Sequence, residues 1–138
     1  MKRIILLAFL CTTTLVMAQR INHVQEAIAN YDYEAALTLI AKEKPTIPLL
    51  LQKGKAQRGL GMNTEALSTY QEIITNDTAN TRAYIEAAEC CRSLAKYQQA
   101  LKYYEQALDL NPENKYVRIQ YIGLLLSLQK FQDALGES

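Results

Sequence analysis

A short block, alanine followed by leucine, returns along this chain at a nearly constant spacing. The interval from Ala66 to Ala100 equals the interval from Ala100 to Ala134, whereas the interval from Ala36 to Ala66 is shorter by four positions. The repeated interval matches a period of about 34 residues, which is typical of a two-helix unit. Such a unit cannot bury both apolar faces alone and stacks on its neighbours. The spacing therefore predicts an all-α chain of stacked helical hairpins.

The clearest unit covers residues 81–114. Its apolar residues recur every three or four positions over 82–94 and again over 97–110, the pattern of two amphipathic helices. Residues 93–96 form a tight connection, and Asn111-Pro112 ends the second helix. Asn80 and Asn114 each precede a helix and are expected to cap it.

Seven positions of this unit resemble the tetratricopeptide repeat family, and they are Tyr84, Ala88, Tyr97, Ala100, Tyr104, Ala107 and Pro112. The preceding unit departs from the family pattern at Asn63, Ile73 and Thr78. The resemblance implies a right-handed superhelical solenoid of antiparallel helix pairs with about three and a half repeats. It also implies a concave groove lined by the first helix of each repeat.

The repeats divide the chain as follows: a partial first repeat at 19–46, a second at 47–80, a third at 81–114 and a truncated fourth at 115–138. In the fourth we expect a first helix over 116–128 and a second that starts at Phe131. A helix left without its partner forgoes burial of its large apolar side chains. We therefore expect the chain to belong to a longer protein or to self-associate through Leu124, Leu125, Leu128 and Phe131.

Residues 1–18 have the pattern of a secretory signal peptide. Lys2 and Arg3 precede an apolar run, and Val16-Met17-Ala18 provides the cleavage site, which leaves Gln19 first. The alternative is an uncleaved anchor, but the stretch 4–18 is shorter than the roughly 20 residues that span a bilayer. We expect export to the bacterial periplasm and no stable membrane span after cleavage. Whether Asn76-Asp77-Thr78 is glycosylated stays open.

The charge of the chain favours no class of charged partner. It contains 15 basic and 14 acidic residues, for a net charge of +1. Removal of Lys2 and Arg3 leaves 15 − 2 = 13 basic against 14 acidic residues, a net charge of −1. Nucleic acid is therefore not an expected partner, and long-range attraction does not select a protein partner.

Residues with catalytic chemistry are scattered. His23 is the single histidine, and Cys90 and Cys91 are neighbours that cannot form a disulfide inside a helix. Glu86 and Glu89 share a helix face, which usually means only that the face is solvated. No nucleophile elbow or phosphate-binding loop is present. We expect no enzyme activity, no cofactor and no metal, and we expect both cysteines to pack as small apolar residues.

The groove remains as the candidate site of a scaffold that works in the cell envelope. By the family resemblance its lining positions are Leu51, Lys55, Arg58, Arg82, Ile85, Glu89, Arg92, Tyr116, Ile119 and Gln120. The clamp that some relatives use for a C-terminal carboxylate is absent, because Ile85, Glu86 and Gln120 occupy its positions. We expect a protein or peptide partner, with Arg58 and Arg92 giving charge-assisted bonds and Glu89 neutralising them in part. The alternatives are plain solvated helix faces, the sensory or interaction part of a longer membrane signalling protein or enzyme, and a gene remnant.

Overall fold

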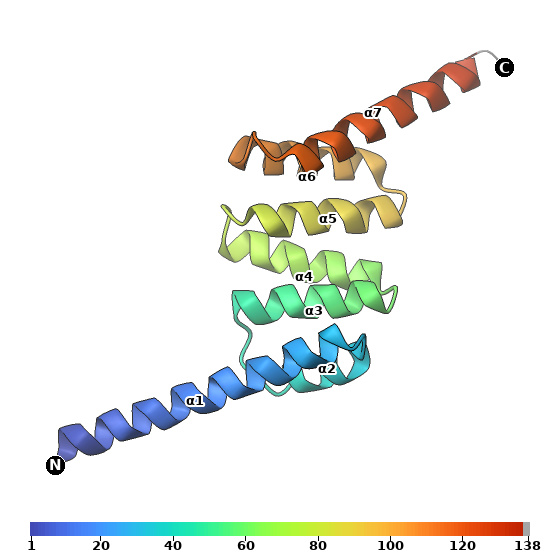
Figure 1. The fold of residues 1–138 in the computed structure, drawn as a ribbon. Helices are drawn as coiled ribbons and strands as arrows, with labels where there is room; N and C mark the ends of the chain where they lie inside the picture. The colour runs from blue at the N-terminus through green and yellow to red at the C-terminus, as the bar shows by residue number, and fades with distance from the viewer. Residues whose placement is uncertain (137–138) are drawn as a thin grey trace. The chain divides into compact units, whose positions relative to one another are not determined.

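The computed structural model describes residues 1–136 of the protein, and over these residues it contains seven α-helices and no β-strand (Figure 1). The chain divides into two compact units, Met1–Gly61 and Met62–Ser138. The boundary between them falls inside the expected second repeat, 47–80. The all-α prediction is confirmed, whereas the boundaries of the individual repeats stay a prediction.

The first unit contains α1 (Lys2–Ala29), α2 (Tyr33–Ile40) and α3 (Ile47–Gly59). The end of α1 packs on α2, and both pack on α3. Their common core consists of Val24, Ile28, Ala36, Ile40, Leu49 and Ala56. Polar caps fix where two of the helices begin: the Asp32 carboxylate accepts from the Ala35 amide, and the Thr46 hydroxyl from the Leu49 amide.

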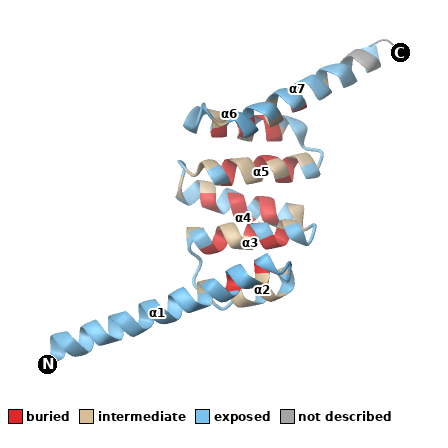
Figure 2. Cartoon of the chain, in the orientation of Figure 1, coloured by how far each residue is buried: buried red, intermediate tan, exposed pale blue. Residues whose placement is uncertain are grey.

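The second unit contains α4 (Asn63–Asn76), α5 (Thr81–Ser93), α6 (Tyr97–Leu110) and α7 (Lys115–Gly136), and each helix packs on the next along the chain. The expected caps are confirmed, because Asn80 accepts from the Ala83 amide and Asn114 from the Val117 amide, each at 3.1 Å. The core is rich in alanine, which lets the helices approach closely, and its large side chains include Tyr70, Ile73, Tyr104 and Val117 (Figure 2).

The third repeat matches its sequence prediction closely. The helix expected over 82–94 is α5, one residue earlier at each end, and the helix expected over 97–110 is α6. Ala95 in the turn has a φ of 57°, a left-handed conformation that reverses the chain. Cys90 and Cys91 are buried in this hairpin as thiols outside any disulfide, as expected, and burial raises the pKa of the Cys91 thiol.

The expected break in the fourth repeat is wrong. α7 runs as one helix from Lys115 to Gly136, through the positions where a turn before Phe131 was expected. A turn there would place Gln129 where Ala95 stands in the third repeat, and a left-handed residue costs about 1–2 kcal/mol. Continuing the helix avoids that cost and retains every backbone hydrogen bond across 129–131.

The expected self-association surface also needs one correction. Leu124 is mostly buried within the second unit, so it offers little surface for contact with a second copy. The structure leaves Leu125 and Phe131 exposed and Leu128 half-buried. The difference arises because Leu124 lies on the covered side of α7, where it lines a pocket with residues of α5.

The first part of α1 has no packing partner, and residues 1–20 are exposed throughout (Figure 2). α1 is long and apolar enough to cross a membrane, judged by length and composition, and a signal sequence near an N-terminus has the same properties. The apolar stretch 4–18 alone is too short for an anchor, but it belongs to a continuous helix of 28 residues, which is long enough to span a bilayer.

Candidate functional site

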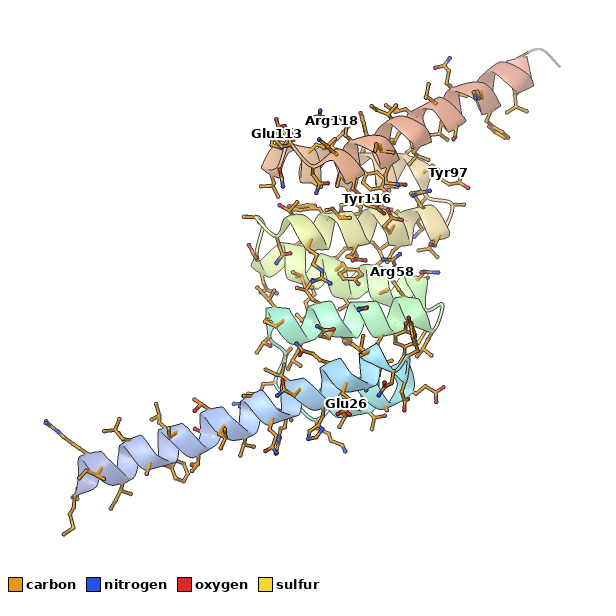
Figure 3. All side chains as sticks on the ribbon, in the orientation of Figure 1. Glu26, Arg58, Tyr97, Glu113, Tyr116 and Arg118 are labelled. Carbon is orange, nitrogen blue, oxygen red and sulfur yellow. The ribbon has the colours of Figure 1, made fainter. Side chains whose placement is uncertain are left out.

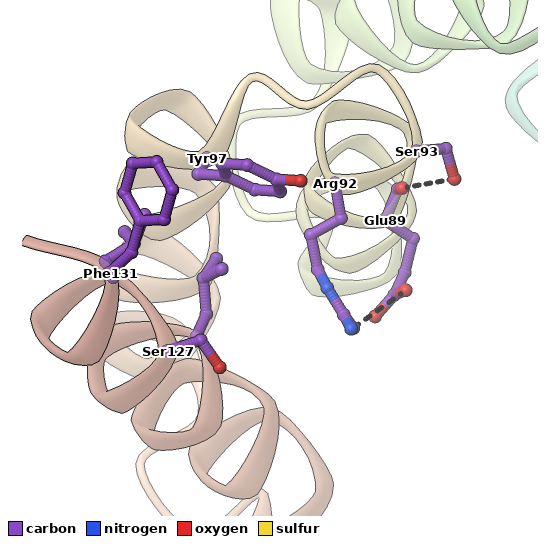
Figure 4. Close-up of a pocket in the computed structure, with 8 residues that line it drawn as sticks. Glu89, Arg92, Ser93, Tyr97, Ser127 and Phe131 are labelled. Carbon is purple, nitrogen blue, oxygen red and sulfur yellow. Dashed lines mark hydrogen bonds and ion pairs between the residues drawn. The ribbon is translucent and has the colours of Figure 1, made fainter. Parts of the chain in front are cut away.

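A pocket of about 720 Å³ opens in the second unit, between the C-terminal half of α5, the start of α6 and the second half of α7 (Figure 4). α5 and α7 provide most of its walls, and α6 contributes its first residue. The lining side chains are Glu89, Arg92, Ser93, Tyr97, Leu124, Ser127, Leu128 and Phe131. All of them lie within Met62–Ser138, so the pocket belongs to one compact unit.

The two ends of the pocket differ in chemistry. Tyr97 and Phe131 both line one end of the pocket, and both rings are partly exposed (Figure 4). Leu124 and Leu128 extend this apolar wall along α7. Glu89 and Arg92 form the other end. Such a combination of an apolar wall with a few fixed polar groups is typical of ligand-binding pockets.

Glu89 is the centre of a hydrogen-bond network. Its Oε1 accepts from the Tyr104 hydroxyl at 2.6 Å and from the Tyr116 hydroxyl at 3.1 Å. Its Oε2 lies 3.4 Å from Nη1 of Arg92, one helical turn along α5. The carboxylate therefore has partners from α5, α6 and α7, and Tyr116 on α7 is visible in Figure 3.

Arg92 is held by the same network. Its Nη1 donates to Oε1 of Gln120 at 2.7 Å and to the Tyr104 hydroxyl at 3.4 Å. The hydrogen bond to Tyr104 raises the pKa of Arg92, and the nearby charge of Glu89 adds to this effect. The guanidinium is therefore charged and fixed in position before any ligand arrives.

Tyr104 is the buried link between these groups. Burial raises the pKa of the Tyr104 hydroxyl well above its usual value, and the hydrogen bond to Glu89 raises it further. The hydroxyl consequently stays protonated and donates to Glu89. The network contains one anion and one cation in mutual contact, so this end of the pocket is polar but close to neutral.

The structure brings together four of the ten predicted groove residues: Glu89, Arg92, Tyr116 and Gln120. Glu89 was expected to lie between Arg58 and Arg92; it lies against Arg92, and its place beside Arg58 stays a prediction. Ile85 is half-buried on α5, and Ile119 is exposed on α7. Arg82 is half-buried at the start of α5. Leu51, Lys55 and Arg58 lie on α3 of the first unit (Figure 3). Their share in a groove stays a prediction.

Sequence reasoning missed Ser93, Tyr97 and Ser127 as lining residues and assigned Leu124, Leu128 and Phe131 to self-association. The predicted groove positions all lie on the first helix of each repeat, and Tyr97 lies on a second helix. A signal was present, because Tyr97 and Phe131 are one full repeat apart and occupy equivalent positions. Both side chains line one pocket because α7 continues without a turn, which the repeat pattern argued against.

A second pocket, of about 360 Å³, lies in the first unit among residues that include Leu37, Ile40, Leu49 and Leu50. It is mostly apolar, with Glu43 and Lys53 at its edge. Among the side chains that the structure describes, no group of three or more His, Cys, Asp or Glu is placed to hold a metal ion.

Antiparallel hairpins with alanine at the helix contacts define a helical repeat protein. A family model described as "Tetratricopeptide repeat" matches residues 92–136, and solved tetratricopeptide repeat domains share the fold. Residues 92–136 are thus similar to a tetratricopeptide repeat, and the chain has the fold of tetratricopeptide repeat domains.

Three comparisons illustrate this similarity. Human tetratricopeptide repeat protein 6 is 30% identical over 89 residues, which are 64% of this chain and 16% of the human protein. The chain thus spans only a small part of that relative. A tetratricopeptide repeat protein from Parabacteroides merdae is 24% identical with a TM-score of 0.74, over 83% of this chain and 48% of that chain. The first such domain of Spaghetti (RPAP3), solved with an HSP90 peptide, is 20% identical with a TM-score of 0.76, over 81% and 92% of the two chains.

Proposed function

We propose that this protein is a non-catalytic scaffold that binds a segment of a protein partner in the pocket between α5, the start of α6 and α7. The observation that carries the proposal is the pocket of about 720 Å³, which combines an apolar wall with a fixed polar end. The solved Spaghetti domain, which holds a peptide on a similar fold, supports it.

The apolar end would take a large side chain of the partner. Tyr97, Leu128 and Phe131 offer partly exposed apolar surface there. Full burial of a leucine-sized side chain contributes about 1.5–3 kcal/mol, so one or two such anchors give a useful affinity. The partner segment would continue over Ile85 and Ile119 on the same two helices.

The polar end would orient the partner rather than attract it from a distance. Arg92 is already held by Glu89, Tyr104 and Gln120, so it loses little freedom when a ligand binds. Because the charges of Glu89 and Arg92 offset each other, the affinity should depend only weakly on salt.

A matched pair of substitutions tests the pocket. Ser127→Tyr fills the space between α5 and α7 and removes only a hydroxyl that donates to the Gly123 carbonyl on the same helix. Ser68→Tyr makes the same change on the exposed surface of α4, outside the pocket. A photo-crosslinking residue at Lys130 of each chain would capture partners in the native host.

We expect the Ser127→Tyr chain to lose captured partners that the Ser68→Tyr chain keeps. Equal recovery of the same partners by both chains would contradict the proposed site. Circular dichroism of both variants would show whether the fold is retained.

We further propose that the scaffold works in the cell envelope after export. The support is the apolar, unpartnered start of α1 together with the cleavage pattern before Gln19. The mass of the cellular product tests this, since cleavage predicts an N-terminus at Gln19 in the exported fraction. An intact chain in the cytoplasmic fraction would contradict export.

The alternative is an interaction part attached to a membrane signalling protein or enzyme, and the observation that favours it is the length of α1. An intact chain that stays with membranes after alkaline carbonate extraction would support this alternative over a cleaved scaffold.

A further inference from the structure

Two positions that are buried in the α5–α6 hairpin recur on α7 as exposed positions. Cys91 on α5 and Leu101 on α6 are 0% and 7% exposed. Leu125 and Leu135, each one full repeat later, are 40% and 60% exposed. The repeat therefore places large apolar side chains at the surface of α7, at positions whose equivalents in the preceding repeat are buried.

The intramolecular way to bury them is blocked by the course of α7. In the third repeat the chain reverses at Ala95, whose φ of 57° lets α6 fold back on α5. Gln129 is the equivalent residue, and it lies within the continuous helix Lys115–Gly136. Residues after 129 therefore extend away from residues 121–125 of the same molecule.

The exposed apolar positions belong to a regular seam along α7. Tyr121, Leu125, Leu128, Gln132 and Leu135 follow one another at spacings of four, three, four and three positions. This is the heptad spacing that brings two helices together side by side. Tyr121 at one end is positioned by a hydrogen bond of 2.8 Å from its hydroxyl to Glu105 on α6. The seam is thus held in place on a packed helix.

The chain itself carries the natural cover for this seam. The start of α6, Tyr97-Gln98-Gln99-Ala100-Leu101, covers α5, and Phe131-Gln132-Asp133-Ala134-Leu135 is its counterpart in the next repeat. Each molecule consequently has both an exposed face at 121–125 and, in Phe131 and Leu135, exposed apolar side chains that fit such a face. A two-fold axis pairs the face of the first molecule with the segment of the second, and the face of the second with the segment of the first.

We infer that the α7 seam binds the α7 seam of a second copy of this chain. The two helices run antiparallel about an axis close to Leu128, so that each copy covers the exposed face on α7 of the other. This exchange reproduces between molecules the contact that α5 and α6 make within one. Leu128 and Phe131 also line the pocket, so a second copy and a bound peptide would compete for this wall of α7.

A disulfide trap in the full chain tests the geometry. The background is Cys11→Ser, which removes the exposed thiol and leaves the buried Cys90 and Cys91. Leu128→Cys then places a thiol at the two-fold axis, where it faces the same thiol of the second molecule. Leu126→Cys is the control, because Leu126 is exposed on the same helix but lies outside the seam. Both chains are kept in mild detergent, so that α1 stays dispersed, and are oxidised under identical conditions.

We expect the Leu128→Cys chain to form disulfide-linked dimers at least about tenfold faster than the Leu126→Cys chain. Adding Leu125→Glu should reduce trapping by about tenfold or more, because a two-fold interface carries each change twice. Equal rates at the two cysteines would overturn the inference, since they would show random collision or contact through α1.

Gln129, the counterpart of Ala95 in the turn of the third repeat, gives a second and independent readout. Gln129→Gly makes a left-handed φ accessible and should lower trapping, because residues after 129 can then fold back on their own helix. Gln129→Ala favours the continuous helix and should leave trapping unchanged or increased. Trapping that falls equally in both variants, or that goes undetected in the parent, would contradict an exchanged helix.

Discussion

The α5–α6 hairpin and α7 begin in the same way and end differently. An asparagine caps α5 and α7 with the same 3.1 Å bond to the amide three residues on, and both helices then follow the same repeat pattern. In the hairpin the chain reverses at Ala95, and α6 covers alanines and cysteines on α5. In α7 the chain continues, and large apolar side chains stay exposed at equivalent positions.

This comparison separates what a repeat sequence determines locally from what it determines only with a neighbour. The N-cap and the helical periodicity act within one helix, and they are the same in both regions. Burial requires a second helix in contact, and the size of the residues differs accordingly. The small residue Ala88 on α5 corresponds to the large residue Ile122 on α7. Small residues in the hairpin therefore reflect close approach, whereas large residues on α7 reflect its absence.

The largest expected effect tests how firmly the hairpin is closed. Tyr104→Ala removes a completely buried ring and the hydroxyl that donates to Glu89. We expect the free energy of unfolding to fall by about 3–5 kcal/mol, as for other buried aromatic truncations. Tyr121→Ala on α7 should cost less than about 1.5 kcal/mol, since that ring is only partly covered. Urea denaturation followed by circular dichroism measures both, and similar losses would break the comparison.

Exchange of residue size between the two regions should have a smaller effect. Ala88→Ile inserts three carbons into a contact with no exposed surface, and we expect a loss of about 1–3 kcal/mol from overpacking. Ile122→Ala removes the same three carbons from an exposed position and should change stability by less than about 0.5 kcal/mol. If Ile122→Ala lowered the free energy of unfolding more than Ala88→Ile in the same measurement, Ile122 would have to be covered by something outside the second unit.

The two caps provide a more sensitive test. Asn80→Ala and Asn114→Ala each leave an amide without its side-chain acceptor, and each should cost about 1 kcal/mol locally. The loss at Asn80 should appear as faster hydrogen exchange throughout the hairpin, because α5 is packed on both α4 and α6. The loss at Asn114 should stay in the first turns of α7. Equal spread of faster exchange in the two variants would show that α7 is as cooperative as the hairpin.

The sequence predicted most of the fold because local signals and repeat period agreed there. Asn80, Ala100 and Tyr104 placed a cap, a close contact and a core ring, and each is where it was expected. The turn before Phe131 was wrong because the alanine block argues for a new helix, whereas the residues around Gln129 contain no helix breaker. Periodicity does not decide between a turn and a continuous helix at Gln129, since the outcome depends on contacts that the second helix would make.

The candidate site was predicted only in part for the same reason. Glu89, Arg92, Tyr116 and Gln120 follow from the groove register, because all lie on first helices. The bonds of Glu89 to Tyr104 and Tyr116 require three helices in a defined packing, and no pairwise spacing reveals them. The apolar end, lined by Tyr97 and Phe131, depended on the course of α7 and was therefore not predicted (Figure 4).

The smallest expected effect concerns glycine, and it has opposite signs at two helix positions. Gly123 lies within α7, and an added Cβ would have no atom within 4 Å, so Gly123→Ala should stabilise the chain by about 0.5–1 kcal/mol through helix propensity. Gly59 ends α3, and a Cβ there would overlap the ring of Tyr33, so Gly59→Ala should destabilise the first unit. Thermal unfolding measures both changes. A gain in stability at Gly123 that accompanies weaker partner capture would show that a ligand approaches the α7 backbone there. A gain with unchanged capture would place the bound segment elsewhere along the open side of α7.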